Sequence, residues 1–461
     1  MPCFDPAVLE PNPELRARML AVLQAALDAV DPYVAVRNVL ESDDTTLQLA
    51  GRAYALADFA NIYVVGAGKA GAPMAQAVAD VLGERITGGQ VVVKTGHSQT
   101  ATNARPSSLV IREAAHPIPD AAGLAAGREI LEIAQQAGPQ DLIIALLSGG
   151  GSALLVAPAT GITLDDLQQM TDALLASGAS INEINCLRKH CSAVKGGQLA
   201  RAAHTATLVT LALSDVIGSP LDVIASGPTV PDASTWQDAW TIVSRYGLQD
   251  KLPPAIAERL QAGLDGHLPD TPKADDPVFA ESRTLVIADN RIAALAAQTR
   301  AKNIGYNALL LTTFLEGEAA QIGKAAVALG KEVLEYGAPI AAPACLILGG
   351  ETTVTLGENP GAGGRNQELT LSAALGLQEW PSITVVSLAT DGTDGPTNSA
   401  GGMVDSGTVA RGKAANLDAE THLRAHNAFP YLQATHDLLV TGPTQTNVND
   451  LVFVFIEPNP A

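Results

Sequence analysis

The stretch NIYVVGAGKAGAPMAQAV, residues 61–78, decides the fold class of this chain. An apolar strand leads directly into the glycines Gly66, Gly68 and Gly71, and the apolar periodicity of a helix follows. This G-x-G-x-x-G spacing is typical of a dinucleotide-binding turn in a parallel α/β sheet. Lys69 lies inside the turn, where its cation is placed to hold a phosphate. The motif therefore favours either nicotinamide redox chemistry or phosphoryl transfer.

The next strand discriminates between these two interpretations. A dinucleotide site needs an Asp or Glu at the end of that strand to bind the ribose hydroxyls. Here the strand is QVVVK, which ends at Lys94, and the nearest acid, Glu84, precedes it. The redox interpretation thus lacks its most discriminating residue. A strand–helix crossover with a surface lysine is the structural alternative.

Apolar strands and helices alternate along the rest of the chain. Strands that are apolar on both faces and separated by helices indicate a parallel sheet covered on both sides. The expected strands are residues 62–65, 90–94, 142–147, 208–213, 284–288, 308–311, 345–348, 383–388 and 451–456.

We predict an α/β fold with two domains. The N-terminal domain, residues 1–240, is expected to be Rossmann-like, with helices on both faces of a parallel sheet. Residues 241–461 are expected to form a smaller C-terminal α/β domain, and the weakly patterned segment 231–280 is interpreted as a connection. Ligands in such folds bind outside the carboxyl ends of the strands, so we expect the site in a cleft between the domains.

Charge and cysteine usage narrow the class of protein. The 461 residues include 28 Lys and Arg against 48 Asp and Glu, so the formal net charge is −20. Such acidity repels DNA, RNA and anionic lipid, so we expect no nucleic-acid partner and no membrane partner. The four cysteines form no C-x-x-C pair, and neither a signal peptide nor a membrane span is recognisable, which predicts a cytoplasmic protein. A homo-oligomer is compatible with the sequence.

A second glycine-rich loop follows the strand at residues 142–147. Three glycines after a buried strand offer a nest of N–H donors suited to phosphate, although a flexible turn would have the same composition. The loop matches neither a Walker loop nor a nucleophile elbow. Its residues are Ser148, Gly149, Gly150, Gly151 and Ser152.

Carboxylates end two other strands. Asp215 follows residues 208–213, and Asp391 and Asp394 follow residues 383–388. Strand-end carboxylates are common Mg²⁺ ligands or general bases. Asp-Gly is also an ordinary turn dipeptide, so for each of these aspartates the turn interpretation stays open.

A third glycine loop, residues 361–368, carries Arg365 and Asn366 at the start of a helix. A guanidinium among glycines is placed to bind carboxylate or phosphate in a fork, and a helix-start arginine paired with Glu368 is the structural alternative. Glu351 follows another glycine turn upstream. The loop histidines His97 and His116 either orient a substrate or are structural, and they lack zinc-site spacing.

Taken together, these loops resemble the class II glycerate kinases, the family with a MOFRL C-terminal domain. The resemblance runs in order over nearly the whole chain, from about residue 61 to 451. It rests on VVGAGKAG, KTGHS, AAHPIPD, LLSGGGSALL, INEINCLRKHCSAVKGGQLA, LSDVIGSPLDVIASGPTVPD, LGGETTVTLGENPGAGGRNQE, LATDGTDGPTNSAGG and TGPTQTNVNDL.

The resemblance implies ATP-dependent phosphorylation of D-glycerate to 2-phospho-D-glycerate with Mg²⁺ or another divalent cation. It implies catalytic roles for Lys69 and Arg365. Two alternatives remain: an NAD(P)H-dependent hydroxypyruvate reductase, which is a name given to some members, and a non-catalytic sugar-acid-binding protein. We assign Asp215 as general base or Mg²⁺ ligand, Asp391 and Asp394 as metal ligands, and Gly66, Gly68, Ser148, Gly149, Gly150, Gly151, Ser152, Glu351 and Asn366 as substrate- or phosphate-binding residues.

Overall fold

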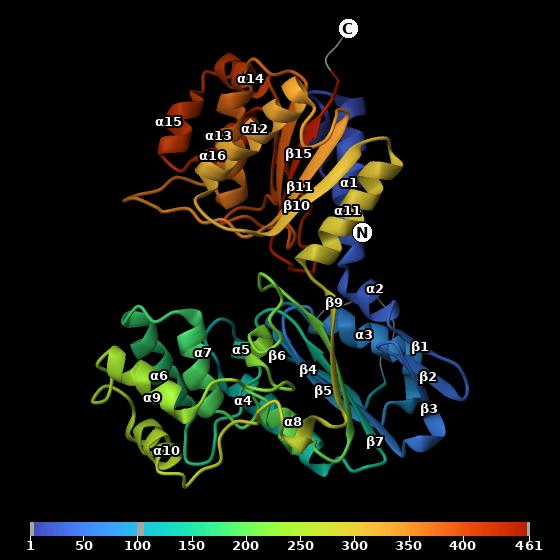
Figure 1. The fold of residues 1–461 in the computed structure, drawn as a ribbon, viewed down its shortest axis with the longest axis vertical. Coiled ribbons are helices and arrows are strands. Elements are labelled where there is room, and N and C mark those ends of the chain that lie inside the picture. Colours follow the sequence, from blue (N-terminus) through green and yellow to red (C-terminus); the bar gives the residue numbers. More distant parts are fainter. Residues whose placement is uncertain (1–3, 99–105, 459–461) are drawn as a thin grey trace. The chain divides into compact units, whose positions relative to one another are not determined.

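The structure is a computed structural model that describes residues 4–98 and 106–458; Cys3 lies outside these residues. The chain forms two compact units (Figure 1). The inserted unit is Pro32–Ile287, and the terminal unit combines the residues up to Asp31 with those from Ala288 onward.

A six-stranded sheet forms the centre of the inserted unit. Neighbouring strands from β6 to β8 pair in parallel. Numbered by their order along the chain, the strands follow the 3-2-1-4-5-6 sequence of a Rossmann sheet, which confirms the predicted fold class. Across the sheet the strands are β6 (Leu109–Ala114), β5 (Gly88–Lys94), β4 (Asn61–Ala67), β7 (Asp141–Leu147), β8 (Thr207–Leu213) and β9 (Ser282–Ala288).

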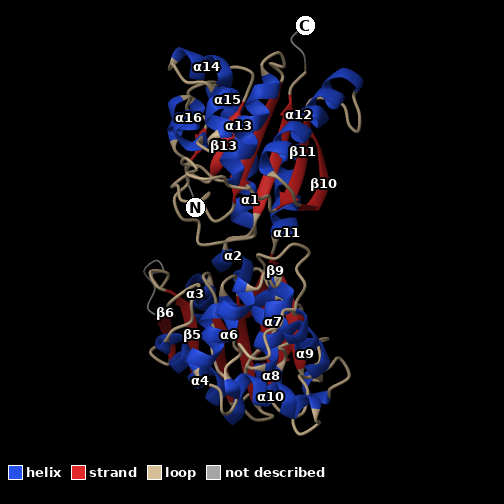
Figure 2. Ribbon diagram, turned by 90° about the vertical axis from the view of Figure 1, so that its left-hand side faces the viewer, coloured by secondary structure: helices blue, strands red, loops and turns tan. Residues whose placement is uncertain are grey.

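Helices cover both faces of this sheet (Figure 2). Val91 of β5 lies against Gly71, the first residue of α3 (Gly71–Leu82). Its neighbour Val92 belongs instead to the apolar cluster that contains Ile130 of α4 (Ala121–Gln136). Because successive side chains of a strand point to opposite faces, α3 and α4 pack on opposite sides of the sheet.

The order of the strands brings two glycine loops to one edge. Strands β4 and β7 are adjacent, and Ala67 pairs with Leu147 at their carboxyl ends. The chain continues from β4 toward β5 on one side and from β7 toward β8 on the other. Ligands of open α/β sheets bind at such a switch point, so the fold itself singles out the loops after β4 and β7.

Residues 231–280 were expected to connect the two domains, but they belong to a helical layer of the inserted unit. Two helices lie in this segment, and with α6 and α7 they surround an apolar cluster of their own. The predicted boundary between residues 240 and 241 lies within one of them, and β9, expected in the second set of strands, joins the first sheet. The four helices are α6 (Leu164–Ala176), α7 (Ile181–His190), α9 (Trp236–Arg245) and α10 (Pro254–Leu264).

The terminal unit is also α/β, but its sheet is mixed. Only β10 and β11 pair in parallel, and the remaining neighbours are antiparallel. Helices α12 (Ala319–Tyr336) and α13 (Arg365–Leu377) pack together over its apolar core. Across the sheet the strands are β10 (Asn307–Leu315), β11 (Ala344–Gly350), β15 (Asp450–Ile456), β12 (Ile383–Ala389), β13 (Gly401–Val404) and β14 (Leu438–Leu439).

The first long helix, α1 (Pro13–Ala29), belongs to this terminal unit although it precedes the inserted unit in the sequence. It packs against α11 (Asn290–Asn303). Arg16 of α1 is buried, with its Nη2 2.5 Å from Asp405 Oδ2 and 2.6 Å from Asp437 Oδ1. A buried guanidinium requires such partners, so these ion pairs fix the helix to its unit.

The remaining elements are short. Strands β1 to β3 form a small antiparallel sheet. The bounds are α2 (Pro32–Arg37), β1 (Leu40–Ser42), β2 (Thr46–Leu49), β3 (Arg52–Ala55), α5 (Gly151–Leu154), α8 (Gln198–Ala202), α14 (Thr408–Ala414), α15 (Ala419–Arg424), α16 (Ala428–Ala434), and the 3₁₀ turns η1 (Pro6–Leu9), η2 (Leu56–Asp58), η3 (Gly83–Arg85), η4 (Ile224–Ser226) and η5 (Pro277–Phe279).

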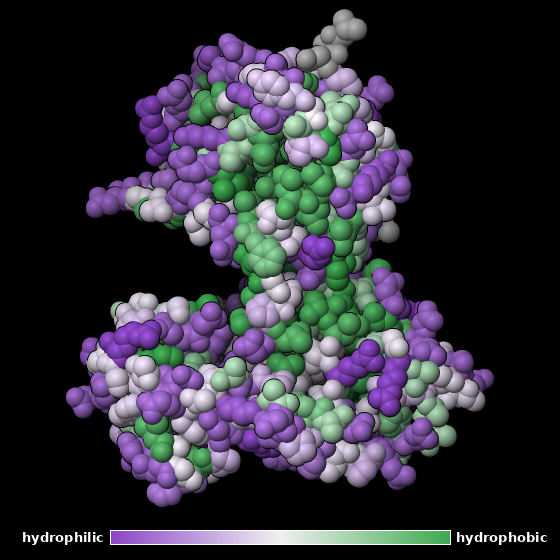
Figure 3. All heavy atoms as spheres, viewed as in Figure 1, coloured by the Kyte–Doolittle hydropathy of each residue, from purple (hydrophilic) through white to green (hydrophobic). Residues whose placement is uncertain are grey.

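Apolar side chains reach the surface of the terminal unit at its edge strand. Leu311 and Phe314 of β10 and Leu295 of α11 are exposed, and Figure 3 shows a hydrophobic surface over these elements. Within the described residues, the helices are all too short or too polar to cross a bilayer.

Candidate active site

The first glycine loop, residues 66–71, touches the second, residues 148–152. Gly68 has φ +140°, and a Cβ at this position would collide with the Ser148 side chain. Ser148 Oγ accepts a hydrogen bond of 3.1 Å from the Ala70 N–H, and the Lys69 N–H donates to the Gly149 carbonyl at 2.9 Å. The two predicted phosphate loops are therefore joined in one structure, and glycine at 68 is a steric requirement.

The second loop presents backbone donors. Gly150 has a left-handed φ of +79°. In the described part of the chain the N–H groups of Gly149 and Gly150 make no hydrogen bond. Successive N–H groups in such a turn form a concave nest for an anion. The arrangement fits a phosphate group held by backbone rather than by side chains.

Charged and titratable side chains surround this nest. Lys69 Cγ would lie 3.4 Å, and His116 Nε2 3.0 Å, from a Cβ placed on Gly150. The Asp215 carboxylate lies against Gly149, where a Cβ would collide with it. Thus the structure brings Lys69, Asp215 and the second glycine loop together, as expected for strand-end residues. Among the described residues, the Lys69 ammonium has no ion pair.

His116 is a member of this group that the prediction left outside its site. Burial, and secondarily the positive charges of Lys69, Lys94 and His97, lower the pKa of His116 to about 4. The imidazole is therefore neutral at pH 7. His97 lies next to it in the network, with Nδ1 3.2 Å from the Lys69 carbonyl oxygen. Both histidines stood out in the sequence, but a loop position alone did not show that they meet at Lys69.

Ser152 and Gly151 lie slightly apart from this centre. Gly151 begins α5, and Ser152 Oγ is 2.7 Å from Ser226 Oγ. The Ser226 hydroxyl in turn donates to Asn185 Oδ1 at 3.2 Å. Ser152 is thus held by other side chains of the inserted unit.

In the terminal unit, Arg365 forms the centre of a second polar group. Its Nε and Nη2 donate to the two carboxylate oxygens of Asp450 at 2.5 and 3.0 Å, and its Nη1 lies 2.9 Å from Glu351 Oε1. Glu368 instead pairs with His426, Nδ1 to Oε2 2.9 Å, so the alternative of an Arg365–Glu368 pair is excluded. Arg365 and Glu351, both predicted site residues, are therefore in direct contact.

Asp450 is the partner that the sequence did not reveal. Burial raises the pKa of Asp450 to about 6, and the hydrogen bonds and charge of Arg365 oppose that rise. Burial lowers the pKa of the Arg365 guanidinium, but the neighbouring carboxylates of Asp450 and Glu351 outweigh burial and raise that pKa above its usual range. Neighbouring Asn449 donates to Glu351 Oε2 at 2.9 Å, while its own buried Oδ1 has no partner among the described residues. The motif TNVND contains both residues.

The predicted metal ligands Asp391 and Asp394 differ sharply. Asp394 is buried and accepts hydrogen bonds from the backbone N–H groups of Asn366 and Gln367, at 3.2 and 2.9 Å, at the start of α13. Burial raises the pKa of Asp394, and these hydrogen bonds oppose it. Asp391 is half-buried and accepts from the Thr393 N–H at 3.0 Å. Asn366 belongs to the same cluster through its side chain, which donates to Asp394.

The residues present do not form a ready-made metal cage. Within residues 4–98 and 106–458, no three His, Cys, Asp or Glu side chains gather as ligands. Mg²⁺ that accompanies a nucleotide needs only one or two carboxylates, because phosphates and waters complete its shell. Asp391 fits such a ligand better than Asp394, whose oxygens already bind the helix start.

Comparison with known proteins agrees with this architecture. A family model described as "Domain of unknown function (DUF4147)" matches residues 18–261, and the MOFRL family model matches residues 344–450. The chain is 39% identical over 443 residues to the glycerate 2-kinase of Pyrococcus horikoshii, which covers 96% of this chain and 98% of that protein. The chain belongs to the glycerate kinase family.

A solved structure extends this glycerate kinase relationship to three dimensions. The crystal structure of glycerate kinase from Thermotoga maritima has a TM-score of 0.85 with this chain at 38% identity, and covers 96% of this chain and 99% of that one. The recognised family and the α/β fold expected from the glycine loops are therefore both confirmed.

Some relatives of this glycerate kinase family member carry the name of the alternative activity. A putative hydroxypyruvate reductase of Agrobacterium vitis is 42% identical over 436 residues, 94% of this chain and 93% of that protein. In the structure, β5 ends at Lys94, and no acid occupies the ribose-binding position of a dinucleotide site.

Proposed function

We propose that this protein transfers the γ-phosphoryl group of ATP to the 2-hydroxyl of D-glycerate and forms 2-phospho-D-glycerate. The observation that carries the proposal is the Rossmann switch point, where Lys69 lies beside two N–H groups of the second glycine loop that make no hydrogen bond within the described residues. Membership of the glycerate kinase family supports the choice of substrate. The proposed setting is the cytoplasm, and a homo-oligomer is compatible with the proposal.

Phosphoryl transfer depends on positioning and on neutralising charge more than on covalent chemistry. In the proposal, the N–H groups of Gly149 and Gly150 hold a phosphate, and Lys69 stabilises the charge of the group in transfer. Asp215, which lies against the same loop, accepts the proton of the 2-hydroxyl. His116 is neutral and donates or accepts a hydrogen bond without adding charge.

Arg365 is proposed to act on the same substrate. Its guanidinium has five N–H donors, and Asp450 and Glu351 use three of them, so donors remain for the glycerate carboxylate or the phosphate. The carboxylates fix its orientation, which favours a fork-like contact. When bound, Mg²⁺ would be held by Asp391 or Asp215 and would neutralise phosphate charge. The cleft expected between the domains belongs to this proposal.

The decisive measurement is the ATP- and Mg²⁺-dependent conversion of D-glycerate, followed by an enolase-coupled assay that consumes 2-phosphoglycerate directly. Formation of 3-phosphoglycerate, which enolase does not accept, would contradict the 2-hydroxyl assignment. The Lys69→Met and Arg365→Ala variants and their combination test a shared transition state. If both residues act on it, the double variant loses far less than the product of the single losses.

The putative hydroxypyruvate reductase among the relatives makes reduction the second candidate. Oxidation of NADH or NADPH by the protein with hydroxypyruvate, in the absence of ATP, measures it directly. Turnover there together with none in the kinase assay would replace the proposal. Binding of D-glycerate with no turnover in either assay would instead favour a sugar-acid-binding protein.

A further inference from the structure

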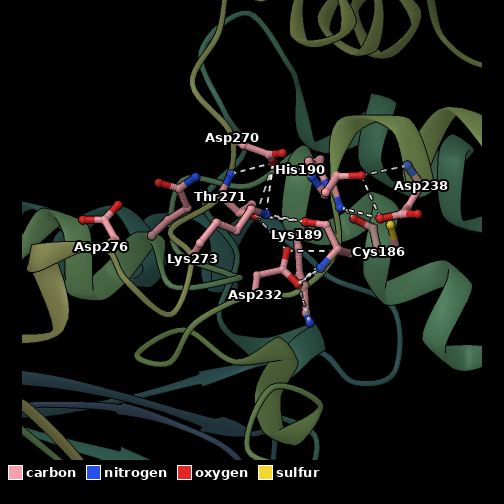
Figure 4. A network of polar contacts seen from close by, with 12 residues as sticks. Cys186, Lys189, His190, Asp232, Asp238, Asp270, Thr271, Lys273 and Asp276 are labelled. Carbon is pink, nitrogen blue, oxygen red and sulfur yellow. Dashed lines mark hydrogen bonds and ion pairs between the residues drawn. The ribbon is translucent and has the colours of Figure 1, made fainter.

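Helix α7 ends in three consecutive basic residues, Arg188, Lys189 and His190, and two of them have acidic partners. Lys189 Nζ lies 3.1 Å from Asp232 Oδ1 and 3.3 Å from an oxygen of Asp222. His190 Nε2 lies 3.0 Å from Asp270 Oδ1. Figure 4 shows this network, with Lys189 and His190 directed toward aspartates from the segments that pack on α7.

Arg188 is different from its two neighbours. No carboxylate and no hydrogen-bond acceptor contacts its guanidinium among the described residues. Burial lowers the pKa of Arg188, yet an arginine stays charged under all ordinary conditions. The positive charge is therefore permanent, is half-buried, and has no counter-charge in contact with it among the described residues.

A second cation, Lys195, lies close to Arg188. The Lys195 side chain is 6% exposed, and its ammonium donates to the Leu155 carbonyl at 2.5 Å, with no carboxylate partner in the described part of the chain. Burial, and then the charge of Arg188, lower the pKa of Lys195 to about 7. Two like charges thus share a poorly hydrated environment, which is costly without an anion.

Both cations line one cavity of about 30 Å³. The hydroxyl-bearing residues Ser152, Thr171 and Ser192 line it too, and the other lining residues are apolar. This space suits a group of a few heavy atoms and is far below the ~300 Å³ at which drug-sized ligand pockets begin. Neither Lys69 nor the N–H donors of Gly149 and Gly150 line it, so the cavity adjoins the proposed phosphate nest only through Ser152.

We propose that this cavity is a second anion site, which binds a phosphate group between Arg188 and Lys195. A guanidinium offers a planar fork of donors and an ammonium a compact charge, and together they match the charge of a phosphate dianion. The Thr171 and Ser192 hydroxyls already donate to backbone carbonyls, so the two cations are the donors proposed for the anion. The phosphate belongs either to inorganic phosphate or to a phosphorylated small acid. This site goes beyond the proposed kinase activity and does not depend on it.

Isothermal titration calorimetry of the full chain with inorganic phosphate, at constant ionic strength, tests the site. Arg188→Met and Lys195→Met remove each charge and retain most of the side-chain volume. We expect each to weaken phosphate binding by tenfold or more, and Arg188→Lys to weaken it less. Lys251→Met removes a lysine that is exposed on the same unit and should leave the affinity within twofold.

The same titration in Lys69→Met separates this site from the phosphate nest. If phosphate binding disappears in Lys69→Met and persists in Arg188→Met, the phosphate binds at the glycine loops, and the second site is refuted while the kinase proposal stands. Absence of phosphate binding in the parent protein also refutes it. Titrations with 2-phosphoglycerate and 3-phosphoglycerate identify the source: tighter binding than inorganic phosphate indicates a phosphorylated acid, and equal binding indicates the free anion.

Arg188→Met should leave the protein about as stable as the parent, because Arg188 has no acidic partner among the described residues. Lys195→Met also removes the hydrogen bond to the Leu155 carbonyl and should cost some stability. Circular dichroism melting checks this expectation. Should a variant fail to fold, crystals of the parent protein grown with phosphate decide the question. An anion bound to Arg188 and Lys195 supports the site, and a cavity that contains only water overturns it.

Discussion

The two polar centres of the molecule have opposite electrostatic character. Around Lys69 in the inserted unit, the nearby histidine His116 is neutral at pH 7 and the ammonium has no ion pair within the described residues. Around Arg365 in the terminal unit, the carboxylates of Asp450 and Glu351 contact the guanidinium directly. The Lys69 ammonium is therefore available to an anionic ligand, whereas the charge of Arg365 is already balanced by its two carboxylate partners.

Because of this difference, we expect the two centres to have different roles in binding a substrate. An anionic group gains most from Lys69 and the N–H donors of the second glycine loop, because the Lys69 ammonium has no ion pair among the described residues. The Asp215 carboxylate lies against Gly149 of the same loop. Arg365 is held by its acids in one orientation, so it offers direction rather than net charge. The acids around it suit a cation or a hydroxyl group. Four predictions test this contrast.

The largest effect is expected for Lys69→Met. Loss of the one charge over the nest should reduce kcat/KM for glycerate phosphorylation by about 10²–10³-fold. The free energy of unfolding should change by less than ~0.5 kcal/mol, because the side chain is half-buried and has no ion pair with any described residue. Steady-state kinetics and urea unfolding measure both, with Lys251→Met as control. A kcat/KM within threefold of the parent would contradict the assignment.

Arg365→Ala should lower both activity and stability. The change leaves Asp450 buried without its cation, which costs about 3 kcal/mol of unfolding free energy, and kcat/KM should fall about 10²-fold. Asp450→Asn in the same chain removes the stranded charge and should restore most of the stability but not the activity. If the single variant loses activity with unchanged stability, Arg365 is not compensated as described.

Substitutions of the two strand-end aspartates of the terminal unit should have different effects, one on stability and the other on Mg²⁺ dependence. Asp394→Ala removes the acceptor of two N–H groups at the start of α13 and should cost about 1–2 kcal/mol in urea unfolding. Asp391→Ala should leave stability nearly unchanged and raise the Mg²⁺ concentration needed for half-maximal activity several-fold. Equal Mg²⁺ dependence in the parent and in Asp391→Ala would rule out Asp391 as the ligand.

The smallest effect concerns His116. Because burial is the larger cause of its lowered pKa, Lys69→Met should raise the pKa of His116 only partly, to a value still below the ordinary 6.5. NMR titration of the imidazole measures this. Since the folded-state pKa lies below the unfolded one, the unfolding free energy should fall as the pH decreases from about 6.5 toward 4. His116→Gln should flatten that slope, and an unchanged slope would show that His116 is solvated.

Local sequence patterns predicted the part of the site that depends on single strands. The turns GAGKAG and SGGGS follow apolar strands, as the sequence indicates. Strands β5 and β6 lie between these two strands in the chain, so the sheet order and not the chain order makes β4 and β7 neighbours and brings Lys69 to the second loop. The role of Asp450 could not be predicted, because its partner Arg365 lies 85 positions away in the sequence. Local sequence periodicity carries no information about such a distant pair. The same holds for Arg16, whose buried ion pairs reach residues near the other end of the chain.

The placement of α1 has a consequence for how the chain is made. The inserted unit, Pro32–Ile287, has all of its residues once Ile287 has been synthesised, and can fold while translation continues. Helix α1 cannot complete its packing in the terminal unit when it is synthesised, because Asp405 and Asp437, the ion-pair partners of Arg16, come about four hundred positions later. A fragment that begins at residue 241 would therefore lack a helix of its own core and leave Asp437 buried without Arg16. The chain passes from one unit to the other at each end of Pro32–Ile287, so one domain is inserted in the sequence of the other. A fragment designed to fold alone should therefore begin and end at the bounds of the inserted unit.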